Sequence, residues 1–161
     1  MSFISNYDCV CLVETFVDSF TTTLFPSYTS FVAPAKKLPH QGRKSGRVIV
    51  LVKNAFLRFV KRMEVNYDNV IVLELSKELL RSDADVFLVN TYLNPPNSPF
   101  YDICDYDNSI TMLERRLLGI VEKYEDASFI LCGDFNARTG NKVPIYFDFA
   151  SSCFDMTGRN F

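Results

Sequence analysis

The sequence lacks any apolar run long enough to cross a membrane as a helix. Its longest purely aliphatic stretch covers residues 48–52, whereas a membrane-spanning helix needs about 20 apolar residues. The N-terminus also lacks a basic segment followed by an apolar one, which is the pattern of a secretory signal peptide. We therefore expect an intracellular protein with no membrane segment.

Paired cysteines are missing as well. The chain has five cysteines, an odd number, and none of them forms a C-x-x-C pair. This usage is typical of reduced thiols in an intracellular protein. We expect each thiol to act as a small, buried hydrophobic side chain. The five are Cys9, Cys11, Cys104, Cys132 and Cys153.

Repeats and low-complexity segments are absent from the 161 residues, of which 48% are hydrophobic and 22% charged. A chain of this length forms one domain and buries about 68–70% of the surface that its unfolded form exposes. We therefore expect a single domain over residues 1–161 with a substantial core.

Charge is unevenly distributed, although the net charge is only −2. Residues 36–62 hold nine of the 17 basic side chains and no acidic one, whereas residues 63–161 hold 8 basic and 16 acidic side chains. A basic segment on an acidic body steers a phosphate backbone to one face, but a solvated hairpin whose lysines protect a sheet edge gives the same pattern. The candidate contacts to nucleic acid are Lys36, Lys37, Arg43, Lys44 and Arg47.

Apolar and alternating runs predict several strands. Residues 56–65 interleave apolar and charged side chains more than the other runs, and we expect them to pair with residues 47–53 through a turn at Lys53 and Asn54. Residues 75–85 form a short helix or a loop. The full set of expected strands covers residues 7–13, 28–32, 47–53, 56–65, 69–75, 86–93 and 127–132. This pattern predicts an α/β domain with mostly antiparallel sheet.

One long helix is predicted from an apolar stripe with steps of three and four. The stripe consists of Ile110, Leu113, Leu117, Val121 and Tyr124. Thr111 and Glu114 fit a capping box, with Asn108 and Ser109 as alternative caps.

Polar side chains follow two buried strands at the point where each strand ends. Glu14 follows residues 7–13, and Asp134 and Asn136 follow residues 127–132. Residues two apart on an extended chain point to the same side, so Asp134 and Asn136 would face one cavity while Phe135 packs. Gly133 permits a tight turn or close approach by a substrate. If the two strands are neighbours, both carboxylates and the amide converge on one spot.

This set suits phosphate chemistry with a hard cation. Mg²⁺ takes oxygen ligands, often one or two carboxylates completed by water, and a metal ion there neutralises charge on a phosphodiester. The amide of Asn136 can donate a hydrogen bond to the oxygen that gains charge. Asp and Asn are also ordinary turn residues after a strand, so the residues alone leave both interpretations open.

Three segments, in this order, resemble the endonuclease/exonuclease/phosphatase superfamily: VCLVET, VFLVNTYLNPP and FILCGDFNART. The similarity is greatest to the endonuclease domains of non-LTR retrotransposons. SGRVIVLVKNAF is similar to the glycine-led strand pair of that branch, and residues 102–124 resemble the helix that precedes GDFN. The resemblance runs from about residue 6 to residue 140, and the combination is more specific than GDFN alone.

The resemblance implies a four-layer α/β sandwich of two packed sheets flanked by helices. It also implies hydrolysis of a phosphodiester by water with Mg²⁺ or Mn²⁺. Glu14 would be the metal ligand, and Tyr92 would lie near the scissile phosphate. Asp134 would orient or activate the water, and Asn136 would bind the phosphate. In retrotransposons this reaction nicks target DNA, which places it in the nucleus, and a reverse transcriptase domain follows in the same chain.

The sequence departs from the family pattern at both ends. The first family strand, which carries an asparagine near the metal, has no counterpart, and neither does the terminal Ser-Asp-His element that supplies acid/base help. The only histidine, His40, lies in the basic loop and does not match that position. Asp148 and Asp155 belong to no recognisable motif. We therefore expect an incomplete domain, a fragment that lacks the first and last strands of the sandwich.

Two alternatives to a DNA endonuclease stay open. One is a catalytically inactive remnant that binds nucleic acid weakly through residues 36–62. The other is a different phosphoesterase of the superfamily, acting on inositol phosphates or sphingolipids.

Overall fold

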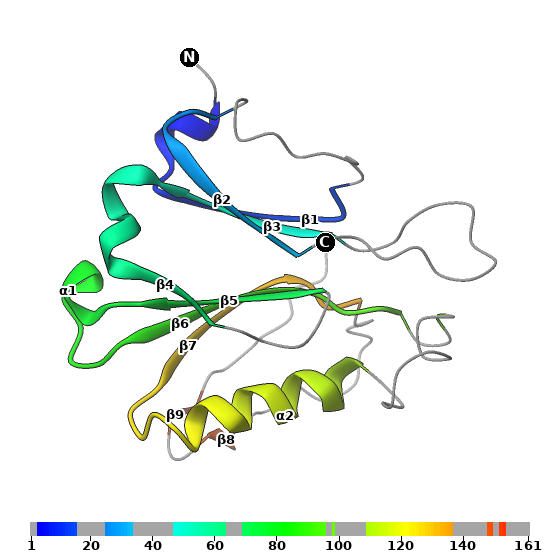
Figure 1. The fold of residues 1–161 in the computed structure, drawn as a ribbon. Coiled ribbons are helices and arrows are strands. Elements are labelled where there is room, and N and C mark those ends of the chain that lie inside the picture. The colour runs from blue at the N-terminus through cyan, green and yellow to red at the C-terminus, as the bar shows by residue number, and fades with distance from the viewer. Residues whose placement is uncertain are drawn as a thin grey trace.

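The computed structural model describes residues 3–15, 25–33, 47–63, 69–95, 98, 109–136, 148–149 and 152–153. Two sheets lie one above the other (Figure 1), with strand orders β1-β3-β2 and β4-β5-β6-β7, and β8 and β9 form a separate pair. The strands are β1 (Cys9–Val13), β2 (Tyr28–Ala33), β3 (Val48–Lys53), β4 (Val60–Met63), β5 (Val70–Leu75), β6 (Val86–Tyr92), β7 (Ser128–Asp134), β8 (Asp148–Phe149) and β9 (Ser152–Cys153). The helices are η1 (Phe3–Asn6), η3 (Asn54–Phe59), α1 (Lys77–Leu80) and α2 (Ser109–Val121). The predicted class, an α/β fold of two packed and mostly antiparallel sheets, is confirmed.

The three-stranded sheet is built around β3, which pairs antiparallel with β1 on one side and β2 on the other. Five of its six residues are buried, because apolar side chains leave both faces of the strand. Val48, Val50 and Val52 join the core between the sheets, whereas Ile49 and Leu51 pack with Tyr28 on the outer face.

The predicted strand at residues 56–65 is confirmed only for residues 60–63, and its predicted pairing with residues 47–53 is wrong. Residues 54–59 form the 3₁₀ helix η3, and only Val60–Met63 is a strand, β4, which pairs with β5 in the other sheet. The physical reason is that both edges of β3 are already occupied, so no hairpin partner can bind there. The chain therefore crosses from one sheet to the other through η3.

The four-stranded sheet combines antiparallel and parallel pairs. β5 pairs antiparallel with β4 and β6, whereas β6 and β7 run parallel. Parallel neighbours need a crossover, usually helical, and α2 supplies it along the outer face of this sheet (Figure 1). The second core cluster lies under α2, so side chains alternate along β6 between the two cores.

The predicted helix is confirmed, but its buried stripe is rotated. Leu113 and Leu117 are buried as expected, whereas Ile110 is 46% exposed, and Met112 and Ile120 are buried instead. The helix begins at Ser109, so Thr111 lies inside its first turn and the predicted capping box is wrong. Among the described residues, no helix has the length and apolarity required to span a bilayer.

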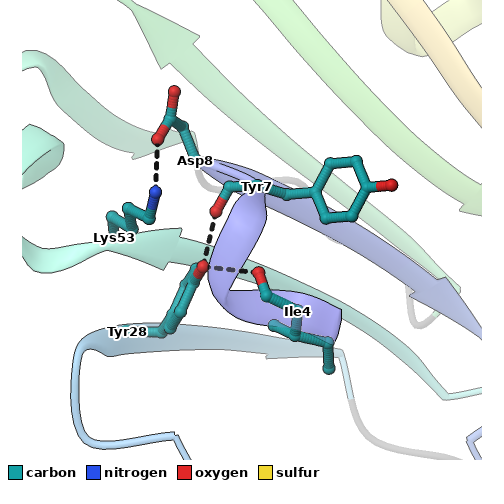
Figure 2. A network of polar contacts seen from close by, with 5 residues as sticks. All are labelled: Ile4, Tyr7, Asp8, Tyr28 and Lys53. Carbon is teal, nitrogen blue, oxygen red and sulfur yellow. Dashed lines mark hydrogen bonds and ion pairs between the residues drawn. The ribbon is translucent and has the colours of Figure 1, made fainter. Parts of the chain in front are cut away.

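A polar network fixes the amino end of β1 to the rest of its sheet (Figure 2). The Tyr28 hydroxyl donates to the carbonyl of Ile4 at 2.7 Å and contacts the carbonyl of Tyr7. Lys53 pairs with Asp8 at 2.7 Å, and this hydrogen bond raises the pKa of Lys53. The strand that leads to Glu14 is therefore anchored at its start.

Candidate active site

The carboxyl ends of β1, β6 and β7 lie on the same side of the molecule, at the right in Figure 1. On β6 and β7 the parallel register places Tyr92 directly opposite Asp134. Tyr92 is buried and Asp134 is half-buried. Two of the predicted site residues are therefore adjacent across a strand pair.

Asp134 and Asn136 lie together, but for a different reason from the expected one. The extended-chain argument fails because Asn136 has φ 44°, so the backbone turns there. The turn brings the Asn136 backbone N–H to Asp134 Oδ1 at 2.8 Å. One carboxylate oxygen therefore orders the turn, and a carboxylate has a second oxygen for another partner.

The amide of Asn136 also ties this turn to the segment after β6. Its Nδ2 donates to the carbonyl of Leu93 at 2.7 Å, and the Leu93 N–H donates to the carbonyl of Asp134 at 2.8 Å. Phe135 packs against the core under α2, so the prediction that it points back and packs is confirmed. Backbone and side-chain bonds thus fix the polar turn to both parallel strands.

Gly133 is required by a close backbone approach. Its φ is +125°, and a Cβ at this position would lie 1.8 Å from the carbonyl oxygen of Thr91. We expected a tight turn or a close approach by a substrate. The approaching group is the backbone of β6, so this glycine serves the strand pairing that positions Asp134.

Glu14 reaches the same region from the other sheet. It directly follows β1, is half-buried and has φ 52°. β1 and β7 are not neighbours in one sheet, as the expected convergence required, but they contact each other across the interface between the sheets. Both carboxylates therefore follow strands that meet, with the carboxyl ends on the same side (Figure 1).

Three thiols mark the contact between β1 and β7. Side-chain interactions with the Cys132 and Cys9 thiols, together with burial, raise the pKa of Cys11. The interaction with Cys11 lowers the pKa values of Cys132 and Cys9, because a donor stabilises each thiolate. All three are free thiols, as predicted, but Cys9 is exposed, so its predicted burial is wrong. Cys104 lies outside the described residues, and of Cys153 the structure describes only its place in β9.

Asn90 is a buried polar residue that the sequence prediction missed. It is fully buried on β6, and its Nδ2 donates to the carbonyl of Ile49 at 3.1 Å and to that of Leu12 at 3.2 Å. Both acceptors belong to the opposite sheet, so one amide links the two sheets close to the site. An amide directly after the apolar run of residues 86–89, inside the expected strand 86–93, was the available signal.

Carboxylates such as those of Glu14 and Asp134 are the type of oxygen ligand that a hard divalent cation prefers. Two carboxylates completed by water are a common Mg²⁺ shell. Among the described residues, no group of three or more His, Cys, Asp or Glu side chains could hold a metal ion. A cation at this edge would therefore depend on few protein ligands.

Most of the predicted nucleic-acid contacts fall where the structure gives no description. Lys36, Lys37, Arg43 and Lys44 lie outside the described residues, as do His40 and Asp155. Arg47 directly precedes β3, is only 6% exposed and has φ 63°, which is unlike a solvated surface contact. Asp148 belongs to β8, in the two-stranded pair.

Sequence comparison identifies the family to which this two-sheet fold belongs. The chain belongs to the Endonuclease/Exonuclease/phosphatase family, whose model matches residues 1–152. The activities in that name all hydrolyse phosphate esters, and members generally use divalent metal ions. No curated protein matches the sequence.

Two solved structures share the fold. A TDP2 structure from C. elegans is 18% identical with a TM-score of 0.50 and is matched over 87% of this chain and 42% of its own. The human Nocturnin catalytic domain with bound sulfate anion is 19% identical with a TM-score of 0.50, over 82% and 52%. The chain thus spans about half, or less, of the length of these structures.

Proposed function

We propose that the chain hydrolyses phosphodiester bonds in DNA, as an endonuclease of the non-LTR retrotransposon type. The observation that carries this proposal is the cluster at the carboxyl ends of β6 and β7. There Tyr92 lies opposite Asp134, and Asn136 is hydrogen-bonded to both strand ends. Family membership supplies the class of reaction.

Each side chain has a role that its geometry supports. Asp134 uses Oδ1 to hold the turn, which leaves Oδ2 to orient the attacking water and accept its proton. Asn136 donates one amide hydrogen to Leu93, and the second is available for a phosphate oxygen. The Tyr92 hydroxyl lies beside the scissile phosphate. Glu14 would hold the divalent cation.

When bound, that cation would neutralise phosphate charge and stabilise the leaving oxygen. The buried strand β6, paired in parallel with β7, supplies the frame for this chemistry, since reacting groups must stay within fractions of an ångström of the productive geometry. The Asn90 amide adds to that frame by linking the two sheets.

The test is nicking of supercoiled plasmid DNA by the whole chain with Mg²⁺. Asp134→Asn keeps an oxygen that can accept the Asn136 N–H but removes the base, so we expect a rate about 10²–10⁴-fold lower. Asp126→Asn is the matched control, because Asp126 is exposed just before the other end of β7, and it should nick like the parent. Equal nicking by the parent and Asp134→Asn would contradict the proposal.

The retrotransposon assignment rests on the likeness of residues 45–56 and 102–124 to that branch. It implies a DNA target in the nucleus and a reverse transcriptase domain as the functional partner. The basic segment 36–62 would then contact the DNA backbone. The logarithm of the binding constant should therefore fall linearly as the logarithm of the salt concentration rises. Affinity that is independent of salt would exclude this role, and a preference for inositol phosphates or sphingolipids would favour another phosphoesterase.

A further inference from the structure

Three cysteine side chains from the two sheets come together at one place. Cys9 and Cys11 lie on β1, and Cys132 lies on β7. Cys11 and Cys132 both pack against the same core cluster between the sheets, and β1 and β7 contact each other across that interface. The proposed hydrolysis uses none of the three.

The contacts of Asn90 place Cys132 beside the Cys11 segment independently. Cys132 Sγ lies 3.8 Å from Asn90 Oδ1 and 3.4 Å from the carbonyl of Val89. The other end of the same amide, Asn90 Nδ2, lies 3.2 Å from the carbonyl oxygen of Leu12. A single short side chain therefore touches both Cys132 and the residue that follows Cys11.

We propose that Cys11 and Cys132 form a redox-active pair, which a peroxide oxidises to a disulfide that joins the two sheets. The Cys132 thiolate attacks one peroxide oxygen, the O–O bond breaks, and Cys132 becomes a sulfenic acid while hydroxide leaves. The Cys11 sulfur then attacks the Cys132 sulfur. The S–O bond breaks, and the leaving hydroxide takes the Cys11 proton as water. Two electrons pass from the two thiols to the peroxide.

Strand geometry favours this pair over Cys9 and Cys11. Residues two apart on an extended strand have Cα atoms about 6.6 Å apart, near the upper limit of about 6.8 Å for a disulfide. Cys11 and Cys132 instead come from opposing sheets and pack against the same core cluster, and β1 and β7 are in contact. Cys9 is the exposed member of the cluster and is the natural comparison residue.

The disulfide would join two strands whose ends carry the proposed site. Cys11 lies three residues before Glu14, and Cys132 lies two residues before Asp134. A bond between residues so distant in sequence closes a long loop, which restricts the unfolded chain and stabilises the fold. We expect oxidation to raise the midpoint of thermal unfolding, and dithiothreitol to reverse the change.

The experiment treats the whole folded chain with hydrogen peroxide, alkylates the remaining thiols, and maps linked peptides without reduction by mass spectrometry. The expected product links the peptides of Cys11 and Cys132 and disappears on reduction. The link should be lost in Cys11→Ser and Cys132→Ser, and it should persist in Cys9→Ser.

The parent protein alone decides the outcome, so a variant that fails to fold leaves the test intact. A predominant link between Cys9 and Cys11, or links through Cys104 or Cys153, would overturn the proposal. Oxidation of Cys132 to sulfonic acid with Cys11 still a thiol would overturn it as well. The mapping is independent of nuclease activity, so inactivity on DNA bears only on the proposed function.

Discussion

At the scale of single residues, Asn90 shows how one buried amide can position two sheets. The two hydrogen bonds that its Nδ2 donates end on Leu12, two residues before Glu14, and on Ile49 in the central strand β3. Because the acceptors are backbone carbonyls of another sheet, no pattern in the local sequence predicts them. The sequence did predict the turn residues Asp134 and Asn136, since a polar turn after an apolar run is a local signal. The expected burial of that strand is wrong, because β7 has exposed side chains on both faces.

Asn90→Asp should destabilise the protein in a pH-dependent way. A buried carboxylate facing two carbonyl oxygens has a raised pKa in the folded state, so the folded chain binds more protons than the unfolded chain. The unfolding free energy should therefore fall as the pH rises from about 4 to 7, with a loss of about 3–5 kcal/mol at pH 7. Urea unfolding at both pH values measures this loss. Asn6→Asp is the control, because Asn6 is exposed and should show no such trend.

Gly133→Ala should also destabilise the fold, by about 1–3 kcal/mol or more, because the added Cβ would overlap the carbonyl oxygen of Thr91. Gly119 offers a matched control, since it lies in α2 and a Cβ added there would meet nothing within 4 Å. Gly119→Ala should stabilise the helix by up to about 1 kcal/mol. Thermal unfolding of the two variants compares them, and equal effects would contradict the close approach at Gly133.

At the scale of elements, helix α2 can be tested by two successive leucines. Leu117 is 5% exposed in the core under the helix, whereas Leu118 is 42% exposed. Leu117→Ala should cost about 2–5 kcal/mol of unfolding free energy, because it removes buried methyl groups and leaves a cavity. Leu118→Ala should change stability by less than about 0.5 kcal/mol. Denaturant unfolding distinguishes the two, and a reversed order would show that the helix presents another face.

Elements were predictable where the apolar pattern was dictated by burial. Residues 48–52 are apolar throughout because β3 is buried on both faces, and the run was correctly interpreted as a strand. Residues 56–65 were misinterpreted because alternation also arises when Phe56 and Leu57 pack on the core from a 3₁₀ helix. Which strand pairs with which depends on the edges that other strands occupy, and local periodicity contains no such information.

At the scale of the whole molecule, the site depends on how the two sheets face each other. Glu14 and Asp134 follow strands of different sheets, so the distance between them depends on packing across the interface. Periodicity predicted the strands but not the sheets, and the two-sheet arrangement came from the family resemblance. The contact between Cys11 and Cys132 was unpredictable for the same reason, because it joins residues far apart in sequence.

The outer edge of the four-stranded sheet gives a last prediction at this scale. β7 ends the strand order among the described strands, and Ile130 and Leu131 are 46% and 42% exposed, one on each face. An exposed apolar edge strand promotes pairing between copies, so light scattering of the parent should rise with concentration. Leu131→Lys should lower this association without lowering the thermal unfolding midpoint. Ser128→Lys is the control, because it adds the same charge at an exposed polar position of β7. It should lower the association less than Leu131→Lys does. If both variants lower it equally, net charge and not the apolar edge controls the association.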